Sequence, residues 1–125
     1  MEKGEIYKLN PYFRADYSPD CYNHPFVFWE EENADFNGIM LTTSGNPEFN
    51  NILMKKEHIE KDHKFKFGKS SKRPNSYIAP LYLLKDVKYE HLIKVGQLTE
   101  EGLNFISDRF YLLKHTDWKT HMKCK

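Results

Sequence analysis

The segment that most restricts the fold is a run of nine uncharged residues, GIMLTTSGN, at positions 38–46. Residues 39–41 are apolar without alternation, which is typical of a strand that is buried on both faces or that closes a small barrel. The hydroxyl groups, glycine and asparagine that follow offer hydrogen-bond donors and acceptors without charge. We interpret the run as a central strand whose carboxyl end delivers a small polar pocket. A simple turn explains the same polar residues, because serine, glycine, asparagine and proline are common in turns.

Length and composition fit one globular domain. The chain has 125 residues, enough to bury one core and too few for two independent cores. Hydrophobic residues make up 39%, charged residues 30% and aromatic residues 15%, a balance that indicates a polar surface around an aromatic-rich core. We therefore expect a single domain over 1–125, with its core at about 4–113 and a polar carboxyl-terminal tail at 114–125.

The sequence contains no signal for a membrane, a metal or a cofactor. The amino terminus is charged and no apolar run reaches membrane-spanning length, so we expect a cytoplasmic protein. Cys21 and Cys124 lie in unlike contexts without paired spacing, which indicates free thiols in a reducing compartment. His115, His121 and Cys124 carry side chains that can bind a metal, but they lack the fixed spacing of a metal site. Phosphate-binding loops and metalloenzyme motifs are also absent from the sequence.

Short strands are predicted along most of the chain, and one helix near its end. Alternating, β-branched or aromatic residues indicate strands at 4–9, 25–29, 52–54, 64–67, 76–84 and 91–93. Pro80 marks an edge or a bulge in one of them, because proline has no amide to donate. Thr99 is a good helix cap, and apolar residues recur behind it at helical spacing, at Leu103, Ile106, Phe110 and Leu113. The fold class is mainly β (α+β), with a C-terminal helix packed on the sheet.

The charge is distributed unevenly, although the formal net charge is only +1. Basic residues gather in the second half of the chain, at Lys61, Lys64, Lys66, Lys69, Lys72 and Arg73. Phe65 and Phe67 lie among them, and cations interleaved with aromatic rings can follow a nucleic-acid backbone and stack its bases. A solvated loop with two core-seeking phenylalanines explains the same residues.

Four segments together resemble the MazF/PemK-type toxins, a family of small SH3-like barrels that cut RNA. They are EKGEIY at 2–7, HPFV at 24–27, LTTSGN at 41–46, and LIKVGQLT at 92–99, which is similar to the family's entry into the last helix. The resemblance implies an SH3-like barrel and a metal-independent endoribonuclease that cleaves single-stranded RNA. It also implies the toxin component of a type II toxin–antitoxin system, a homodimer that is paired with an antitoxin protein.

The resemblance assigns candidate site residues as well. In the family, a threonine at the strand end and an arginine before the proline serve catalysis. Thr42, or its neighbour Thr43, carries over, whereas His24 occupies the place of the arginine. Histidine exchanges protons near neutral pH, so His24 and Thr42 are the candidate catalytic residues. Hydroxyl, amide and positive groups are the candidates for substrate binding, namely Arg14, Thr43, Ser44, Asn46, Lys72 and Arg73. A hydrogen-bonded residue at a strand entry is the other interpretation of His24.

Two departures from the family pattern favour a different function. His24 replaces the arginine, and Ala79-Pro80-Leu81 stands where a polar Asp-Gln pair is often found. The alternative hypothesis is a non-catalytic SH3-like barrel that binds RNA or a peptide or protein partner in the same groove.

Overall fold

The computed structural model describes residues 2–16, 24–32, 35–61, 63–85 and 89–117. The strands in these ranges are β1 (Glu5–Leu9), β2 (Phe26–Glu32), β3 (Asp35–Thr42), β4 (Ile52–Leu53), β5 (Tyr77–Ile78), β6 (Leu81–Lys85), β7 (Leu92–Gln97) and β8 (Lys114–Asp117). The α-helix is α2 (Glu100–Arg109), and the 3-10 helices are η1 (Pro11–Asp16), η2 (Pro47–Phe49), η3 (Lys56–His58), η4 (Tyr89–His91) and η5 (Phe110–Leu112). The described part of the chain is therefore mainly β, in the α+β class.

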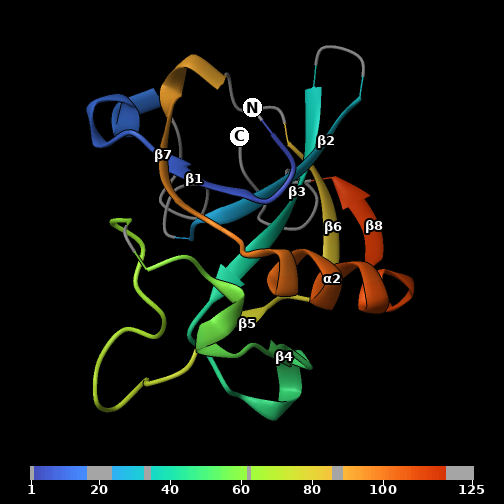
Figure 1. The fold of residues 1–125 in the computed structure, drawn as a ribbon. Coiled ribbons are helices and arrows are strands. Elements are labelled where there is room, and N and C mark those ends of the chain that lie inside the picture. Colours follow the sequence, from blue (N-terminus) through green and yellow to red (C-terminus); the bar gives the residue numbers. More distant parts are fainter. Residues whose placement is uncertain (1, 17–23, 33–34, 62, 86–88, 118–125) are drawn as a thin grey trace.

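The strands pair into one sheet in which β3 is central (Figure 1). The main path runs β4-β5-β3-β2-β1-β7, with β6 on another part of β3 and β8 parallel to β6. One edge of β3 pairs with β2, while its other edge pairs with β6 over the first part of the strand and with β5 over the last part. Between those two partners lies Pro80, where the predicted strand 76–84 is interrupted as expected. The prediction of a central strand in the run 38–46 is confirmed, although β3 begins earlier and ends at Thr42.

Strand pairing among the described residues does not close this sheet into a barrel. The two ends of the path are nevertheless linked, because the segment after η3 contacts the edge of β7. Ile59 forms an isolated bridge with Leu98, and the Glu60 amide donates to the Gln97 carbonyl at 2.9 Å. Because this segment follows β4, the first strand of the path, it connects the β4 end of the sheet to the β7 end.

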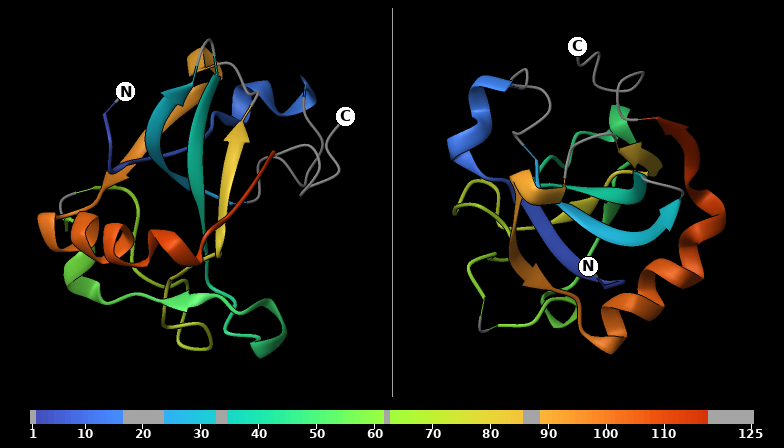
Figure 2. Two further views of the ribbon diagram at one scale, coloured as in Figure 1. Left: turned by 90° about the vertical axis from the view of Figure 1, so that its right-hand side faces the viewer. Right: turned by 90° about the horizontal axis from the view of Figure 1, so that it is seen from above.

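The main core lies between the sheet and α2. Ile6, Val27 and Ile39 contribute from the sheet and Ile106 from the helix, and all four have no exposed area. Thr99 caps the helix as predicted, since its side chain accepts a hydrogen bond from the Gly102 amide at 3.2 Å. Figure 2 shows α2 on one side of the sheet and η1 on the other. The expected packing of the C-terminal helix on the sheet is confirmed.

His58, the last residue of η3, is buried against α2, although the charges around it in the sequence indicate a surface residue. Its side chain is 6% exposed, its ring packs 4.3 Å from the ring of Phe105, and its Nδ1 accepts from the Lys55 amide at 3.0 Å. Burial lowers the pKa of His58, and the positive charge of Lys55 lowers it further. The helix comes this close because residue 102 is glycine: a Cβ there would lie 2.2 Å from the His58 carbonyl oxygen.

Two parts of the secondary-structure prediction were wrong. Residues 114–117, predicted to begin an aperiodic tail, form β8, whose residue Lys114 pairs with Leu81 of β6. This parallel partner is distant in sequence, so no local pattern reveals it. Residues 64–67 form no strand; the Phe65 amide donates to the Val95 carbonyl at 2.6 Å, and the Phe65 and Phe67 rings pack on the main core. Their apolar character reflects burial.

Other sequence predictions fall partly outside the described residues. Cys21, His121 and Cys124 lie outside them, so the structure does not test the free thiols. Within the described ranges, no three histidine, cysteine, aspartate or glutamate residues gather as metal ligands. None of the helices described has the length and apolar character needed to cross a membrane.

Candidate functional site

The pairing of β2 with β3 brings His24 and Thr42 opposite each other. Phe26 is the partner of Met40 in this antiparallel ladder, and the Leu41 amide donates to the Pro25 carbonyl at 2.9 Å. Continuing the register by two residues places His24 across from Thr42. Side chains that are directly opposite in an antiparallel pair point to the same face. The two candidate catalytic residues therefore share one face at the end of β3.

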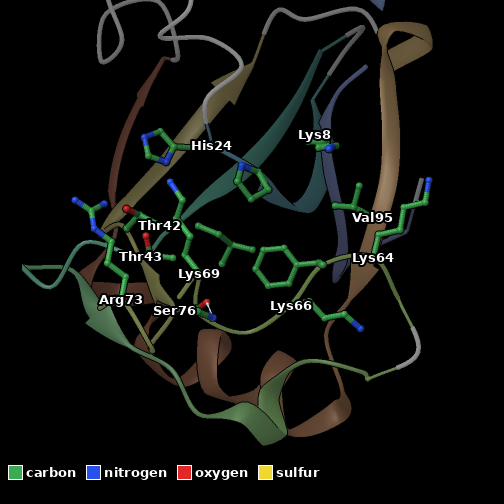
Figure 3. A pocket seen from close by; sticks show the side chains of 14 residues that line it. Lys8, His24, Thr42, Thr43, Lys64, Lys66, Lys69, Arg73, Ser76 and Val95 are labelled. Carbon is green, nitrogen blue, oxygen red and sulfur yellow. Dashed lines mark hydrogen bonds between the residues drawn. The ribbon is translucent and has the colours of Figure 1, made fainter. Parts of the chain in front are cut away.

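Both residues line a cavity of about 450 Å³ (Figure 3). Its floor is largely apolar and is made by Pro25, Leu41, Phe65 and Val95. Its polar lining comprises the hydroxyl groups of Thr42, Thr43 and Ser76, and the positive side chains of Lys8, Lys64, Lys66, Lys69 and Arg73. No carboxylate occurs among the described residues that line it. We call this space the cationic cavity.

Two of these cations extend from the loop 68–75, whose backbone is fixed by hydrogen bonds within the loop. The Lys69 amide donates to the Arg73 carbonyl at 2.8 Å, and the Arg73 amide donates back to the Ser70 carbonyl at 3.1 Å. Gly68 begins the loop with a φ of +75°, where a Cβ would lie 2.4 Å from the Pro74 carbonyl oxygen. In Figure 3 the Lys69 side chain points toward His24, and the Arg73 side chain lies beside Thr42 and Thr43.

A second cavity, of about 530 Å³, adjoins the first and shares Thr43 and Arg73 with it. We call it the amide cavity, because Asn46 and Asn75 line it. The loop that follows β3 forms part of its wall and is fixed by hydrogen bonds from its own side chains. The Ser44 amide donates to Thr42 Oγ1 at 3.2 Å, and Asn51 Nδ2 donates to the Ser44 carbonyl at 3.1 Å.

Most of the residues that the sequence analysis selected lie on these two cavities. His24, Thr42, Thr43 and Arg73 line the cationic cavity, and Thr43, Ser44, Asn46, Lys72 and Arg73 line the amide cavity. Arg14 lines neither. It lies on η1 next to Phe13. The Phe13 ring stacks on the His91 ring with 3.9 Å between their centroids, so η1 is packed beside η4. Arg14 is thus the one selected residue that does not lie on either cavity.

Several cations of the site were not among the residues predicted from the sequence. Lys64, Lys66 and Lys69 belong to the basic stretch that was recognised as a whole, but Lys8 was missed. A signal for Lys8 was available: it lies two residues after the buried Ile6, and side chains two apart in a strand share a face. Lys8 therefore extends the face of Ile6 toward the mouth of the cavity.

A paired carboxylate on β1 does not offset this positive charge. Glu5 lies outside the lining of the cationic cavity, and its carboxylate contacts Lys94 Nζ at 2.8 Å and accepts from the Tyr7 hydroxyl at 2.9 Å. Burial acts to raise the pKa of Glu5, but the hydrogen bonds, that from Lys94 first, outweigh it and lower the pKa. Burial and the bond to Glu5 raise the pKa of Tyr7 to about 12. The Glu5 charge is thus neutralised locally by Lys94.

Models of known protein families, curated protein sequences and solved structures gave no match to this chain. Its function has therefore to be inferred from the geometry of the two cavities.

Proposed function

We propose that this chain is a metal-independent endoribonuclease of the MazF/PemK type that cleaves single-stranded RNA. The observation that carries the proposal is the cationic cavity, where a histidine and a threonine share one face among five lysine and arginine side chains. Cations without neighbouring carboxylates attract the phosphate backbone of a nucleic acid. Hydroxyl groups and cations also stabilise the negative charge that develops on a reacting phosphate.

The reaction needs only groups of these kinds. The ribose 2′-oxygen attacks the neighbouring phosphorus, the bond from phosphorus to the 5′-oxygen breaks, and a 2′,3′-cyclic phosphate and a 5′-hydroxyl are left. One proton leaves the 2′-hydroxyl and one reaches the 5′-oxygen. His24 acts as acid or base in one of these transfers, and water exchanges the other proton. Thr42 donates a hydrogen bond to the phosphate, and Arg73 and Lys69 offset its charge.

The wider biological role is part of the same proposal. We infer an SH3-like barrel and the toxin component of a type II toxin–antitoxin system, which acts in the cytoplasm as a homodimer and is inhibited by a cognate antitoxin protein. Support for the barrel comes from the Ile59–Leu98 bridge, which links the two ends of the strand path. Support for the toxin comes from the sequence resemblance.

A non-catalytic binding module is the second candidate function. It is favoured by the lining of the cationic cavity, where His24 is the only imidazole among the described residues. Cleavage by proton transfer uses both an acid and a base, and His24 supplies one imidazole for these two roles. The apolar floor formed in part by Leu41 and Phe65 would suit a peptide or the bases of an RNA.

Cleavage of a labelled single-stranded RNA in the presence of a chelator tests the proposal. The wild type should yield a 2′,3′-cyclic phosphate, at a rate that changes between about pH 5 and 8, where histidine ordinarily titrates. His24→Ala should lower the rate about a hundredfold, because it removes the proton carrier. Thr42→Ala should cost less, because one neutral hydrogen bond is lost. The control is His63→Ala, which removes a half-buried histidine that lines neither cavity.

Three results would count against parts of this proposal, provided that thermal unfolding shows each variant to be folded. Full cleavage by His24→Ala would refute the catalytic assignment. An equal loss in His63→Ala would mean that the effect is not specific to the cavity. A wild type that binds RNA or a peptide without cleaving RNA would establish the binding module in place of the nuclease.

A further inference from the structure

The amide cavity differs in composition from the cationic cavity beside it. Its lining includes two aromatic side chains, Phe49 and Tyr77, and two primary amides, Asn46 and Asn75, next to Arg73. Phe49 is 56% exposed, although phenylalanine is among the residues most often buried. An exposed ring at the wall of a cavity offers a flat apolar surface on which a planar ligand can stack.

The chain holds the Phe49 ring on a short fixed turn, η2. Asn46 caps this turn: its Oδ1 accepts from the Glu48 amide at 3.0 Å, and its carbonyl accepts from the Phe49 amide at 3.1 Å. The turn ends at Asn50, which has a φ of 54°, and Asn51 then fastens the loop to the Ser44 carbonyl. A ring that is positioned before binding loses little conformational freedom when a ligand stacks on it.

The amides of this cavity can recognise the edge of a planar ligand. The Oδ1 of Asn46 is already used by the cap, which leaves its Nδ2 to donate to a ligand. Asn75 is half-buried and lines the cavity, and no described residue forms a hydrogen bond with its side chain, so both its donor and its acceptor are available to a ligand. A donor and an acceptor on one amide match the edge of adenine, whose N7 accepts and whose N6 donates. Aromatic stacking together with hydrogen bonds at the base edge is how proteins read single-stranded RNA.

We propose that the amide cavity is a nucleobase subsite that holds one adenine of a single-stranded RNA, stacked on Phe49 and read at its edge by Asn75. Thr43 and Arg73 line both cavities, so the base bound here is next to the phosphate held in the cationic cavity. The identification of the ligand as RNA rests on the proposed function. The subsite gives that function a sequence preference, because it selects the nucleotide beside the reacting phosphate.

Binding of a cleavage-resistant RNA tests the subsite without relying on catalysis. The probes are fluorescent eight-nucleotide uridine oligomers with 2′-fluoro sugars, which lack the attacking hydroxyl, and each carries A, C, G or U at one central position. Dissociation constants are measured by fluorescence anisotropy at one fixed salt concentration. The wild type should bind the adenine probe about tenfold more tightly than the other three, as one bidentate amide contact allows.

Three variants separate stacking from edge recognition. Phe49→Ala should weaken binding of the adenine probe about tenfold through the loss of one stacked base, and Phe49→Tyr should restore it. Asn75→Ala should reduce the preference for adenine to about twofold or less while changing affinity for the uridine probe little. Tyr111→Ala is the matched control, because Tyr111 is an 82% exposed ring that lines neither cavity.

The outcomes separate this inference from the proposed function. Equal affinity of the wild type for all four probes, or a preference for adenine that survives both Phe49→Ala and Asn75→Ala, would overturn the subsite even if the protein cleaves RNA. A protein that prefers adenine and loses that preference in Asn75→Ala, yet cleaves no RNA, would support the subsite and refute the nuclease. Absence of binding to every probe would overturn both.

Discussion

Replacing Arg73 by glutamine should reduce the salt dependence of RNA binding. Positive side chains line the two adjoining cavities at six positions, namely Lys8, Lys64, Lys66, Lys69, Lys72 and Arg73. Each phosphate contact to a single strand adds about −0.7 to the slope of log K against log salt concentration, because condensed counterions are released. If all six residues contact phosphates, the slope reaches about −4, and affinity falls about 300-fold between 50 and 200 mM salt.

Arg73 is the most informative of these residues because it lines both cavities. Arg73→Gln should make the slope shallower by about 0.7 and weaken binding to a similar extent for all sequences, since phosphate contacts carry no base information. The assay is fluorescence anisotropy with an all-uridine 2′-fluoro oligomer over a series of salt concentrations. Lys56→Gln is the matched control: it changes the net charge equally, but Lys56 is exposed on η3 and lines neither cavity.

The comparison of slopes decides the result. A slope that is unchanged in Arg73→Gln would mean that Arg73 contacts no phosphate. An equal change in Lys56→Gln would mean that binding depends on net charge and not on this groove. A wild-type slope near zero would refute phosphate binding in the cationic cavity altogether.

Two further predictions concern stability. The lowered pKa of His58 means that the folded state binds fewer protons than the unfolded state below about pH 6.5, so the free energy of unfolding should fall as the pH drops below that value. Urea unfolding should show a smaller fall in His58→Asn than in the wild type. An equal fall in the two proteins would mean that His58 does not cause the pH dependence. Gly102→Ala should lower the free energy of unfolding by about 1–3 kcal/mol, because its Cβ meets the His58 carbonyl oxygen at 2.2 Å. Unchanged urea unfolding, compared with Ser107→Ala at an exposed position of α2, would show that α2 shifts without cost.

Local signals in the sequence were sufficient for much of the fold. The apolar run before Thr42, the interruption at Pro80 and the cap at Thr99 each depend on a few neighbouring residues, and each was found. The parallel pairing of β8 with β6 and the burial of His58 depend on partners distant in sequence, and both were missed. No pattern of neighbouring residues contains that information.

The candidate site shows the same division. His24 and Thr42 were selected by resemblance, but their placement on one face follows from the register of Phe26 with Met40. A shift of that register by one residue would turn one of the two side chains to the opposite face. The sequence also grouped Arg14 with the site, because its charge alone does not reveal that η1 packs beside η4 and that Arg14 lines neither cavity.

The interruption at Pro80 divides the walls of the cavities into parts of unequal rigidity. On one side, β1 pairs with β7 at five positions and β2 pairs with β3 at six, while on the other β4 and β5 are strands of only two residues each. Short ladders have few hydrogen bonds to lose, so this corner opens at a lower energetic cost than the rest of the sheet. A ligand that bridges the two walls would therefore contact one rigid wall and one that moves at low cost. Adaptation of the protein to different ligands would come almost entirely from movement of β4 and β5, the strands of the wall that carries Tyr77.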